Sequence, residues 1–126
     1  MRITIFGATG LLGKALMREW REDEVTGLGS ADGDIRDEKQ VLHLVERSRP
    51  DWIVLTAAFT DVDGCETNRD LAFGVNGRGA ANVARAAKQQ GARLLFLSTD
   101  YVFDGTKTTP YTESTSPRNV VRIAAQ

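Results

Sequence analysis

Three glycines at a regular spacing, Gly7, Gly10 and Gly13, stand between a short apolar run at residues 3–6 and an amphipathic stretch that begins at Leu11. The first glycine lets the chain leave a strand in a conformation that a Cβ resists, and the second lets the backbone approach a phosphate closely. The third lets the following helix pack closely on the sheet. Because the free N–H groups and the positive end of that helix face the same point, the segment predicts a dinucleotide-binding turn. The alternative is a plain structural turn, which needs only one or two glycines. The residues predicted to bind the cofactor here are Gly7, Thr9, Gly10, Leu11, Leu12 and Gly13.

Apolar runs alternate with amphipathic stretches along the chain. We expect strands at residues 3–6, 25–28, 52–55 and 94–97, and helices at residues 11–22, 38–49 and 69–90. Two of the runs, 52–55 and 94–97, are apolar throughout, which is typical of parallel strands covered on both faces. This order predicts an α/β fold with a Rossmann-like, doubly wound parallel sheet, as one NAD(P)-binding domain over residues 1–126. Beyond Tyr101 the chain is rich in Thr, Ser, Pro and Gly, so we expect a polar loop.

The composition favours a small-molecule site. The chain has 126 residues with 16 basic and 17 acidic side chains, so it offers no basic surface for nucleic acid or for an anionic membrane. Its single cysteine, Cys65, cannot form an intrachain disulfide, and no Cys/His cluster predicts a metal site. The first apolar run is too short for a signal peptide or a membrane span, and we expect a cytoplasmic protein.

The residues after the second expected strand bear on the choice between NADPH and NADH. In NAD-dependent proteins an acidic residue there accepts a hydrogen bond from the ribose 2′-hydroxyl. This chain has Gly29 and Ser30 instead, so no carboxylate opposes a 2′-phosphate and Ser30 can donate to one. We therefore expect NADPH, with NADH as the alternative because no Arg or Lys stands there. Further on, Asp34 can accept from the adenine amino group and Ile35 can cover the ring edge, while Asp37 suits the N-cap of the second helix.

Small residues follow the third expected strand. Ala57 and Ala58 leave room for a flat cofactor across the strand ends, although such residues also simply pack well. The helix expected at residues 69–90 holds three glycines close together, which indicates close backbone packing or local weakness, because glycine costs about 1 kcal/mol relative to alanine in a helix interior. Asn76 in the same stretch is expected to hydrogen-bond the backbone of the neighbouring strand.

The segment at residues 97–105, Leu-Ser-Thr-Asp-Tyr-Val-Phe-Asp-Gly, carries the most specific pattern. Together with the glycine motif and residues 34–37, 49–51, 57–63 and 75–76, it resembles the dTDP-4-dehydrorhamnose reductase family of the extended short-chain dehydrogenase/reductase superfamily. This resemblance implies NAD(P)H-dependent reduction of the 4-keto group of a dTDP-6-deoxy sugar, in the biosynthesis of dTDP-L-rhamnose. It also adds Thr60 to the cofactor site and leaves a homodimer open.

The same resemblance implies which residues act on the nucleotide-sugar substrate. Thr99 matches the hydroxyl that hydrogen-bonds the C4 oxygen, and Asp100 and Tyr101 match residues that line the substrate pocket. The family's Tyr-x-x-x-Lys pair, which supplies the proton and holds the nicotinamide ribose, falls on Val121 and Ala125, neither of which can transfer a proton. We therefore expect an incomplete sheet, no substrate-binding C-terminal part and negligible reductase activity from this chain alone.

Two other interpretations stay open. A non-catalytic NADP-binding regulatory module, or a degenerate fragment, would keep the cofactor turn without the chemistry. A related sugar epimerase or dehydratase is disfavoured, without being excluded, by Ser-Thr-Asp-Tyr-Val-Phe at residues 98–103.

Overall fold

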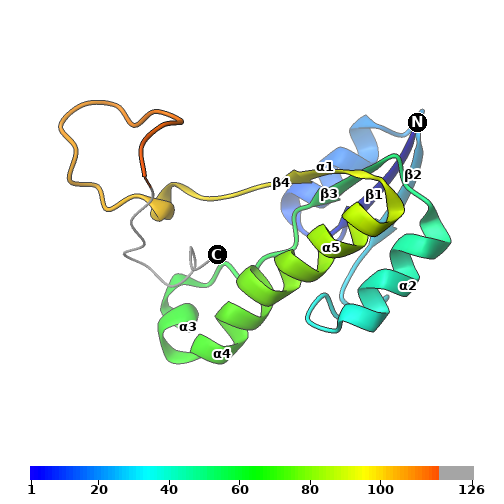
Figure 1. Cartoon of the computed structure of the whole chain (residues 1–126), viewed down its shortest axis with the longest axis horizontal. Helices are drawn as coiled ribbons and strands as arrows, with labels where there is room; N and C mark the ends of the chain where they lie inside the picture. Colours follow the sequence, from blue (N-terminus) through cyan, green and yellow to red (C-terminus); the bar gives the residue numbers. More distant parts are fainter. Residues whose placement is uncertain (117–126) are drawn as a thin grey trace.

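The computed structural model describes residues 1–116 of the chain (Figure 1). Strands and helices alternate along this part, and each expected strand forms within one or two residues of its predicted place. The elements in chain order are β1 (Arg2–Phe6), α1 (Leu11–Glu19), β2 (Glu24–Leu28), α2 (Glu38–Ser48), β3 (Trp52–Leu55), α3 (Val62–Thr67), α4 (Arg69–Ala72), the π-helix η1 (Phe73–Gly79), α5 (Ala80–Gln90), β4 (Arg93–Phe96) and the 3-10 helix η2 (Asp100–Val102).

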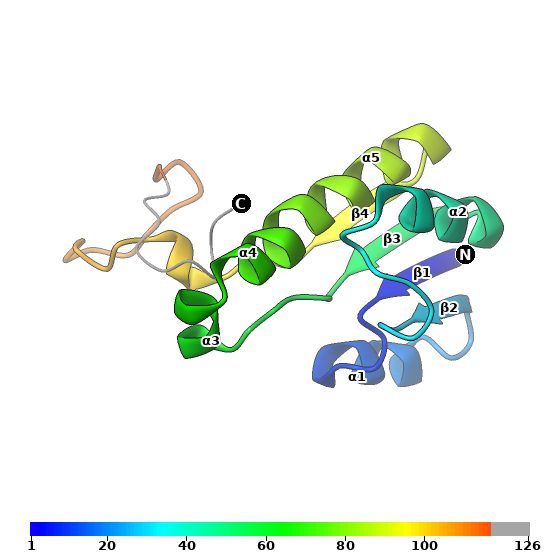
Figure 2. The ribbon, with the colours of Figure 1, turned by 90° about the horizontal axis from the view of Figure 1, so that it is seen from below.

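The strands form one parallel sheet in the order β2-β1-β3-β4. Helix α1 lies on one face of the sheet, and α2 and α5 lie on the other (Figure 2). The chain passes from β2 back across β1 to β3, so the strand order reverses between β1 and β3. In open α/β sheets ligands bind outside the carboxyl ends of the strands at such a switch point. The predicted doubly wound α/β sheet is confirmed, and its topology places the glycine turn at the switch point.

Each face of the sheet has its own hydrophobic core. On the face toward α2 and α5 the buried side chains are Phe6, Leu28, Val41, Val45, Ile53, Leu55, Val83, Ala86 and Ala87. On the face toward α1, Ile3, Ile5 and Val54 are buried, with Leu16, Met17 and Trp20 packed against them. The alternation of side chains along β1 and β3 therefore supplies both cores, as expected for strands covered on both sides.

The prediction that residues 94–97 form a strand covered on both faces is wrong. Strand β4 ends at Phe96, and Leu95 and Phe96 are 45% and 37% exposed. Leu95 is paired with Val54 of β3 and so points to the same face of the sheet, where α1 packs mainly against β1 and β2 and leaves Leu95 exposed. Within residues 1–116, β4 is an edge strand with one uncovered apolar face.

The helices also differ from their predictions in detail. The stretch at residues 69–90 is helical throughout, but its middle is the π-helix η1, which contains the three glycines. Helix α1 ends at Glu19, earlier than predicted, because Trp20 leaves the helical conformation with φ −96° and ψ 26°. The predicted N-cap is confirmed: the Asp37 carboxylate accepts hydrogen bonds from the backbone N–H groups of Lys39 and Gln40.

Candidate functional site

The turn after β1 has the backbone that its glycines predict. Gly7 has φ +93°, and a Cβ at this position would lie 2.5 Å from the backbone nitrogen of Ala57. A Cβ on Gly13 would lie 2.1 Å from the carbonyl oxygen of Gly7, so this glycine brings α1 against the turn itself, where we expected contact with the sheet. Gly10 is exposed and precedes α1, which has no side-chain cap. The first N–H groups of α1 are therefore available to an anion.

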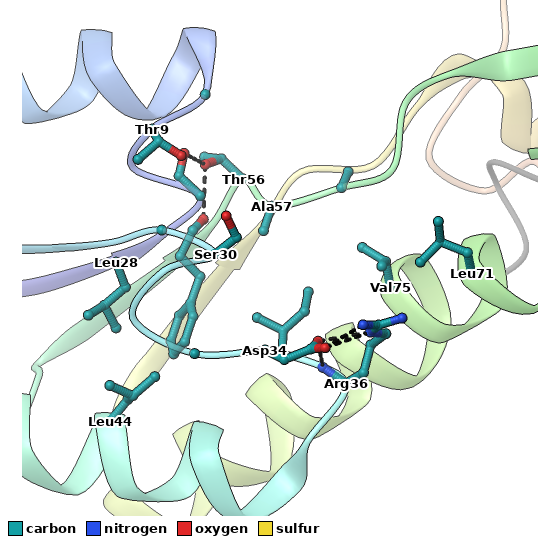
Figure 3. A pocket seen from close by; sticks show the side chains of 17 residues that line it. Thr9, Leu28, Ser30, Asp34, Arg36, Leu44, Thr56, Ala57, Leu71 and Val75 are labelled. Carbon is teal, nitrogen blue, oxygen red and sulfur yellow. Dashed lines mark hydrogen bonds and ion pairs between the residues drawn. The ribbon is translucent and has the colours of Figure 1, made fainter. Parts of the chain in front are cut away.

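A cavity of about 520 Å³, here called the first cavity, opens beside this turn at the carboxyl ends of β1 and β2 (Figure 3). Leu71 of α4 and Val75 of η1 form the wall opposite the strand ends. The volume is in the range of sites for small organic ligands, and the lining combines apolar side chains with a few polar groups. The residues predicted to bind the cofactor that line this cavity are Gly7, Thr9, Gly10, Ser30, Asp34, Ile35, Ala57 and Ala58.

The loop after β2 brings a carboxylate back to the end of that strand. The Asp32 carboxylate accepts the backbone N–H of Gly29 at 2.7 Å, while Ser30 lines the first cavity with its side chain exposed. Asp32 thus brings a carboxylate near the end of β2 through the fold of the loop, but it is not among the residues that line the first cavity. Its Oδ2 atom is held by Gly29, so this carboxylate is fixed in position by the turn.

Arg36 is a polar residue of the first cavity that the sequence analysis missed. Its Nε atom donates to both carboxylate oxygens of Asp34, at 2.9 and 2.8 Å, and its backbone N–H donates to Oδ1 at 2.9 Å (Figure 3). The side-chain hydrogen bonds from Arg36 lower the pKa of Asp34, so the carboxyl is ionised at neutral pH. An adenine amino group, the expected partner of Asp34, must therefore share these oxygens with Arg36.

The residues after β3 are fixed to the end of β1. Thr56 Oγ1 donates to the carbonyl oxygens of Phe6 and Gly7 at 3.0 and 3.2 Å, and the Ala57 N–H donates to Phe6 O at 3.0 Å. Ala57 and Ala58 line the first cavity and also a second one. These small residues form a wall common to both cavities, which agrees with a flat ligand that crosses the strand ends.

The second cavity, of about 380 Å³, lies at the carboxyl ends of β3 and β4. Leu12, Thr60, Thr99 and Tyr101 line it, together with the shared alanines. The Thr99 hydroxyl donates to Asp100 Oδ1 at 3.2 Å and accepts the Tyr101 N–H at 3.3 Å. Its proton is thus directed to a carboxylate, and it becomes a donor to a substrate oxygen only when it turns away from Asp100.

Three predicted site residues line neither cavity. Leu11 is 95% exposed at the start of α1, Gly13 is buried under the turn, and Asp100 contacts Thr99 from outside the second cavity. The positions assigned to the missing catalytic pair, Val121 and Ala125, lie outside the described residues.

The apolar residues of the cavity wall were not predicted. Leu71 and Val75 could have been found from their spacing of four, which places them on one face of the predicted helix. The position of Arg36, two residues after Asp34, was only a weak indication that the two side chains pair.

Within residues 1–116, no group of three or more His, Cys, Asp or Glu side chains is arranged to hold a metal ion. No helix in the same range is both long and apolar enough to cross a bilayer.

The sequence matches a protein family described as the RmlD substrate binding domain over residues 1–121. It is 43% identical over 123 residues to dTDP-4-dehydrorhamnose reductase of Streptomyces griseus, a match that covers 94% of this chain and 40% of that protein. It is 40% identical over 114 residues to the spore coat polysaccharide biosynthesis protein SpsK of Bacillus subtilis, covering 89% of this chain and 40% of that protein. The chain thus spans about 40% of the length of these relatives.

Solved structures show the same similarity. The crystal structure of dTDP-4-dehydrorhamnose reductase from Bacillus anthracis in complex with NADP superposes with a TM-score of 0.94 at 40% identity, covering 98% of this chain and 45% of that one. UDP-glucose 4-epimerase of Thermus thermophilus in complex with NAD superposes with a TM-score of 0.87 at 26% identity, covering 99% and 47%.

Proposed function

The chain belongs to the family described as the RmlD substrate binding domain, and on this basis we propose that residues 1–126 are the NAD(P)-binding domain of a dTDP-4-dehydrorhamnose reductase. The reaction is the NAD(P)H-dependent reduction of a dTDP-4-keto-6-deoxy sugar in dTDP-L-rhamnose biosynthesis. The observation that carries this proposal is the pair of cavities that share the wall of Ala57 and Ala58 and extend from the start of α1 to Thr99. A dinucleotide needs a continuous site, because its adenine and nicotinamide ends are joined by the pyrophosphate and must both be accommodated.

The residues of the first cavity fit a nicotinamide dinucleotide. The N–H groups at the start of α1 would hold the pyrophosphate. A Cβ at Gly10 would contact only Gly7 O, at 3.3 Å, and would otherwise extend into open space, so the absence of a side chain there leaves the approach to these groups open. Ile35, Leu71 and Val75 would enclose the adenine, and Asp34 could accept a hydrogen bond from its amino group. We propose NADPH as the cofactor, with NADH possible, because Ser30 can donate to a 2′-phosphate and the reductase of Bacillus anthracis was crystallised with NADP.

The second cavity is the place of the chemistry in this proposal. When bound, NADPH supplies the hydride. Thr99 would donate a hydrogen bond to the C4 oxygen of the sugar and so stabilise the charge that develops there, while Tyr101, which lines this cavity, would contact the sugar and Asp100 would act through Thr99. Asp100 orients the Thr99 hydroxyl in the free protein, at 3.2 Å, and releases it when the keto oxygen arrives.

We further propose that this chain has negligible reductase activity by itself. Positions 121 and 125 hold Val and Ala, which cannot donate the proton that the alkoxide needs. Positioned acid–base catalysis contributes typically about a hundredfold to ten-thousandfold, so its loss leaves little turnover.

The direct test is calorimetric titration of the chain with NADPH. We expect saturable binding that Gly10→Glu weakens by at least about tenfold, because the added carboxylate faces the pyrophosphate site. Ala84→Glu adds the same charge at an exposed position on α5 and should leave the affinity unchanged. Absence of NADPH binding, or equal loss in both variants, would contradict a cofactor site at this turn.

The second test mixes the chain, NADPH and a dTDP-4-keto-6-deoxy sugar and follows NADPH oxidation. We expect none. A chain that binds NADPH, leaves the sugar unreacted and co-purifies with a defined partner enzyme would instead support a regulatory module, the alternative that the substitutions at positions 121 and 125 favour.

A further inference from the structure

Two buried asparagines on the helical run from α4 to α5 each hold the backbone of a different segment of the site. Asn76 of η1 is 4% exposed; its Oδ1 accepts the Phe59 N–H at 2.8 Å and its Nδ2 donates to Phe59 O at 3.0 Å. The predicted bond from Asn76 to the backbone of the neighbouring strand is instead made to Phe59, in the segment that follows β3. Asn82 of α5 is 2% exposed, and its Nδ2 donates to the carbonyl oxygen of Ile35 at 2.9 Å. The Phe59 segment borders the second cavity, and Ile35 lines the first.

The Ile35 side chain is fixed by the same helical run. A Cβ on Gly79 would lie 2.7 Å from Ile35 Cγ1, and a Cβ on Gly74 would lie 3.2 Å from Arg36 Cδ. These two glycines of η1 therefore let the loop of Ile35 and Arg36 lie directly on the helix backbone. The close packing that the glycines predicted is thus contact with this loop. The position of Ile35 depends on two contacts: Asn82 bonds its carbonyl oxygen, and its side chain lies against Gly79.

Asn82 is held in turn by a surface network. Its Oδ1 accepts from Arg85 at 2.6 Å, and Arg85 Nε pairs with Glu38 Oε1 of α2 at 2.8 Å. With both ends of the amide engaged, the side chain has one orientation in which Nδ2 faces Ile35 O. Loss of the Nδ2 donor leaves the half-buried Ile35 carbonyl without this partner, so we expect the loop to move.

We propose that Asn82 is a positioning residue for the adenine end of the cofactor site: it holds the Ile35 loop against α5 at the distance that adenine requires. This role rests on the proposed function. It predicts that Asn82 controls the affinity for the adenosine half of the cofactor, although it contacts neither cavity, whereas a purely structural asparagine would affect unfolding alone.

The test uses Asn82→Asp, which keeps the acceptor for Arg85 and removes the donor to Ile35. The matched control is Asn68→Asp, which makes the same change of charge at an exposed position without a side-chain cap bond. Calorimetric titrations with adenosine 2′,5′-bisphosphate and with NADPH are made at a temperature where circular dichroism shows both variants folded. We expect Asn82→Asp to bind adenosine 2′,5′-bisphosphate about tenfold more weakly and the control to bind within twofold of the unaltered chain.

A second variant reaches Ile35 without touching Asn82. Gly79→Ala pushes the Ile35 side chain from α5, and it should weaken adenosine 2′,5′-bisphosphate binding in the same way even if Asn82→Asp does not fold. Unchanged affinity in the folded variants overturns the positioning role while the proposed function stands. If the unaltered chain binds none of NADPH, NADH and adenosine 2′,5′-bisphosphate, the proposed function fails and this role fails with it.

Discussion

The two cavities meet at one wall, yet they are held in different ways. The first cavity is fixed by bonds between residues far apart in sequence: Thr56 bonds the carbonyl of Phe6, Asn82 that of Ile35, and Gly7 N–H that of Leu28. At the far side of the second cavity, Thr99 bonds residues one to three positions away in sequence, Asp100, Tyr101 and Val102. That side follows the exposed strand β4, and residues 97–116 leave the sheet in Figure 1.

This difference in hydrogen bonding predicts that the two cavities differ in rigidity. A wall fixed by long-range bonds keeps its shape as long as the sheet is folded, because each bond joins two elements of the core. A wall fixed by local bonds shifts when its own short segment shifts. We therefore expect the first cavity to be preformed and the second to adapt to its ligand.

The largest expected effect is on the free energy of unfolding, and it contrasts a buried leucine of β3 with an exposed leucine of β4. Leu55→Ala in β3 removes a side chain that is 1% exposed and should lower the free energy of unfolding by about 2 to 5 kcal/mol. Leu95→Ala, the same change in β4 at 45% exposure, should cost less than about 1 kcal/mol. Urea denaturation measures both. If both variants lost the same free energy of unfolding, β4 would be covered in solution and the proposed contrast between the two cavities would not hold.

The next effect tests whether close contact or backbone conformation makes the glycine turn irreplaceable. Gly7 and Gly91 both have positive φ, +93° and +69°, but only Gly7 would place a Cβ within 4 Å of other atoms. Gly91→Ala should cost about 1 kcal/mol, for the backbone alone. Gly7→Ala should cost about 2 to 4 kcal/mol and abolish NADPH binding, because the contact with Ala57 must also be relieved. Urea denaturation and NADPH titration of both variants distinguish these explanations. Similar losses of stability in the two variants would mean that the positive φ alone explains the need for glycine at position 7.

A smaller effect concerns the ion pair in the first cavity. Arg36 lowers the pKa of Asp34 below its unfolded value, so the stabilisation is complete above the unfolded pKa, near 3.9, and is lost as pH falls through the folded pKa. Arg36→Gln should raise the pKa of Asp34 toward its ordinary value and make stability fall less steeply below about pH 4. A carboxyl titration by NMR measures it, and an unchanged pKa of Asp34 would show that the pair does not persist in solution.

The smallest effect is expected on the side of the second cavity. The rings of Phe103 and Tyr111 stack with centroids 4.3 Å apart, inside the segment that leaves the sheet. Tyr111→Ala should change the melting temperature of the sheet by less than about 2 °C, because the stack contributes to no core described above. A larger decrease, measured by calorimetry, would show that residues 97–116 are coupled to the sheet.

The sequence predicted what depends on local pattern. The glycine turn, the strands and the Asp37 cap follow from short-range spacing, and each forms where expected. The exposure of Leu95 was not predictable in this way, because an apolar run looks the same whether or not a helix covers it. The roles of Asp32, Arg36 and Asn82 depend on how loops fold back on the sheet, which residue spacing does not encode.

The turn of Gly29 and Asp32 has a consequence for evolution and engineering. The hydrogen bond of 2.7 Å from Gly29 N to the Asp32 carboxylate stabilises the turn without any contribution from the side chains of Ser30 and Ala31. Both of these intervening residues are exposed. Substitutions at these two positions disturb neither core of the sheet. Under the proposed function, the preference between NADPH and NADH can therefore change at these two positions while both cores keep their packing.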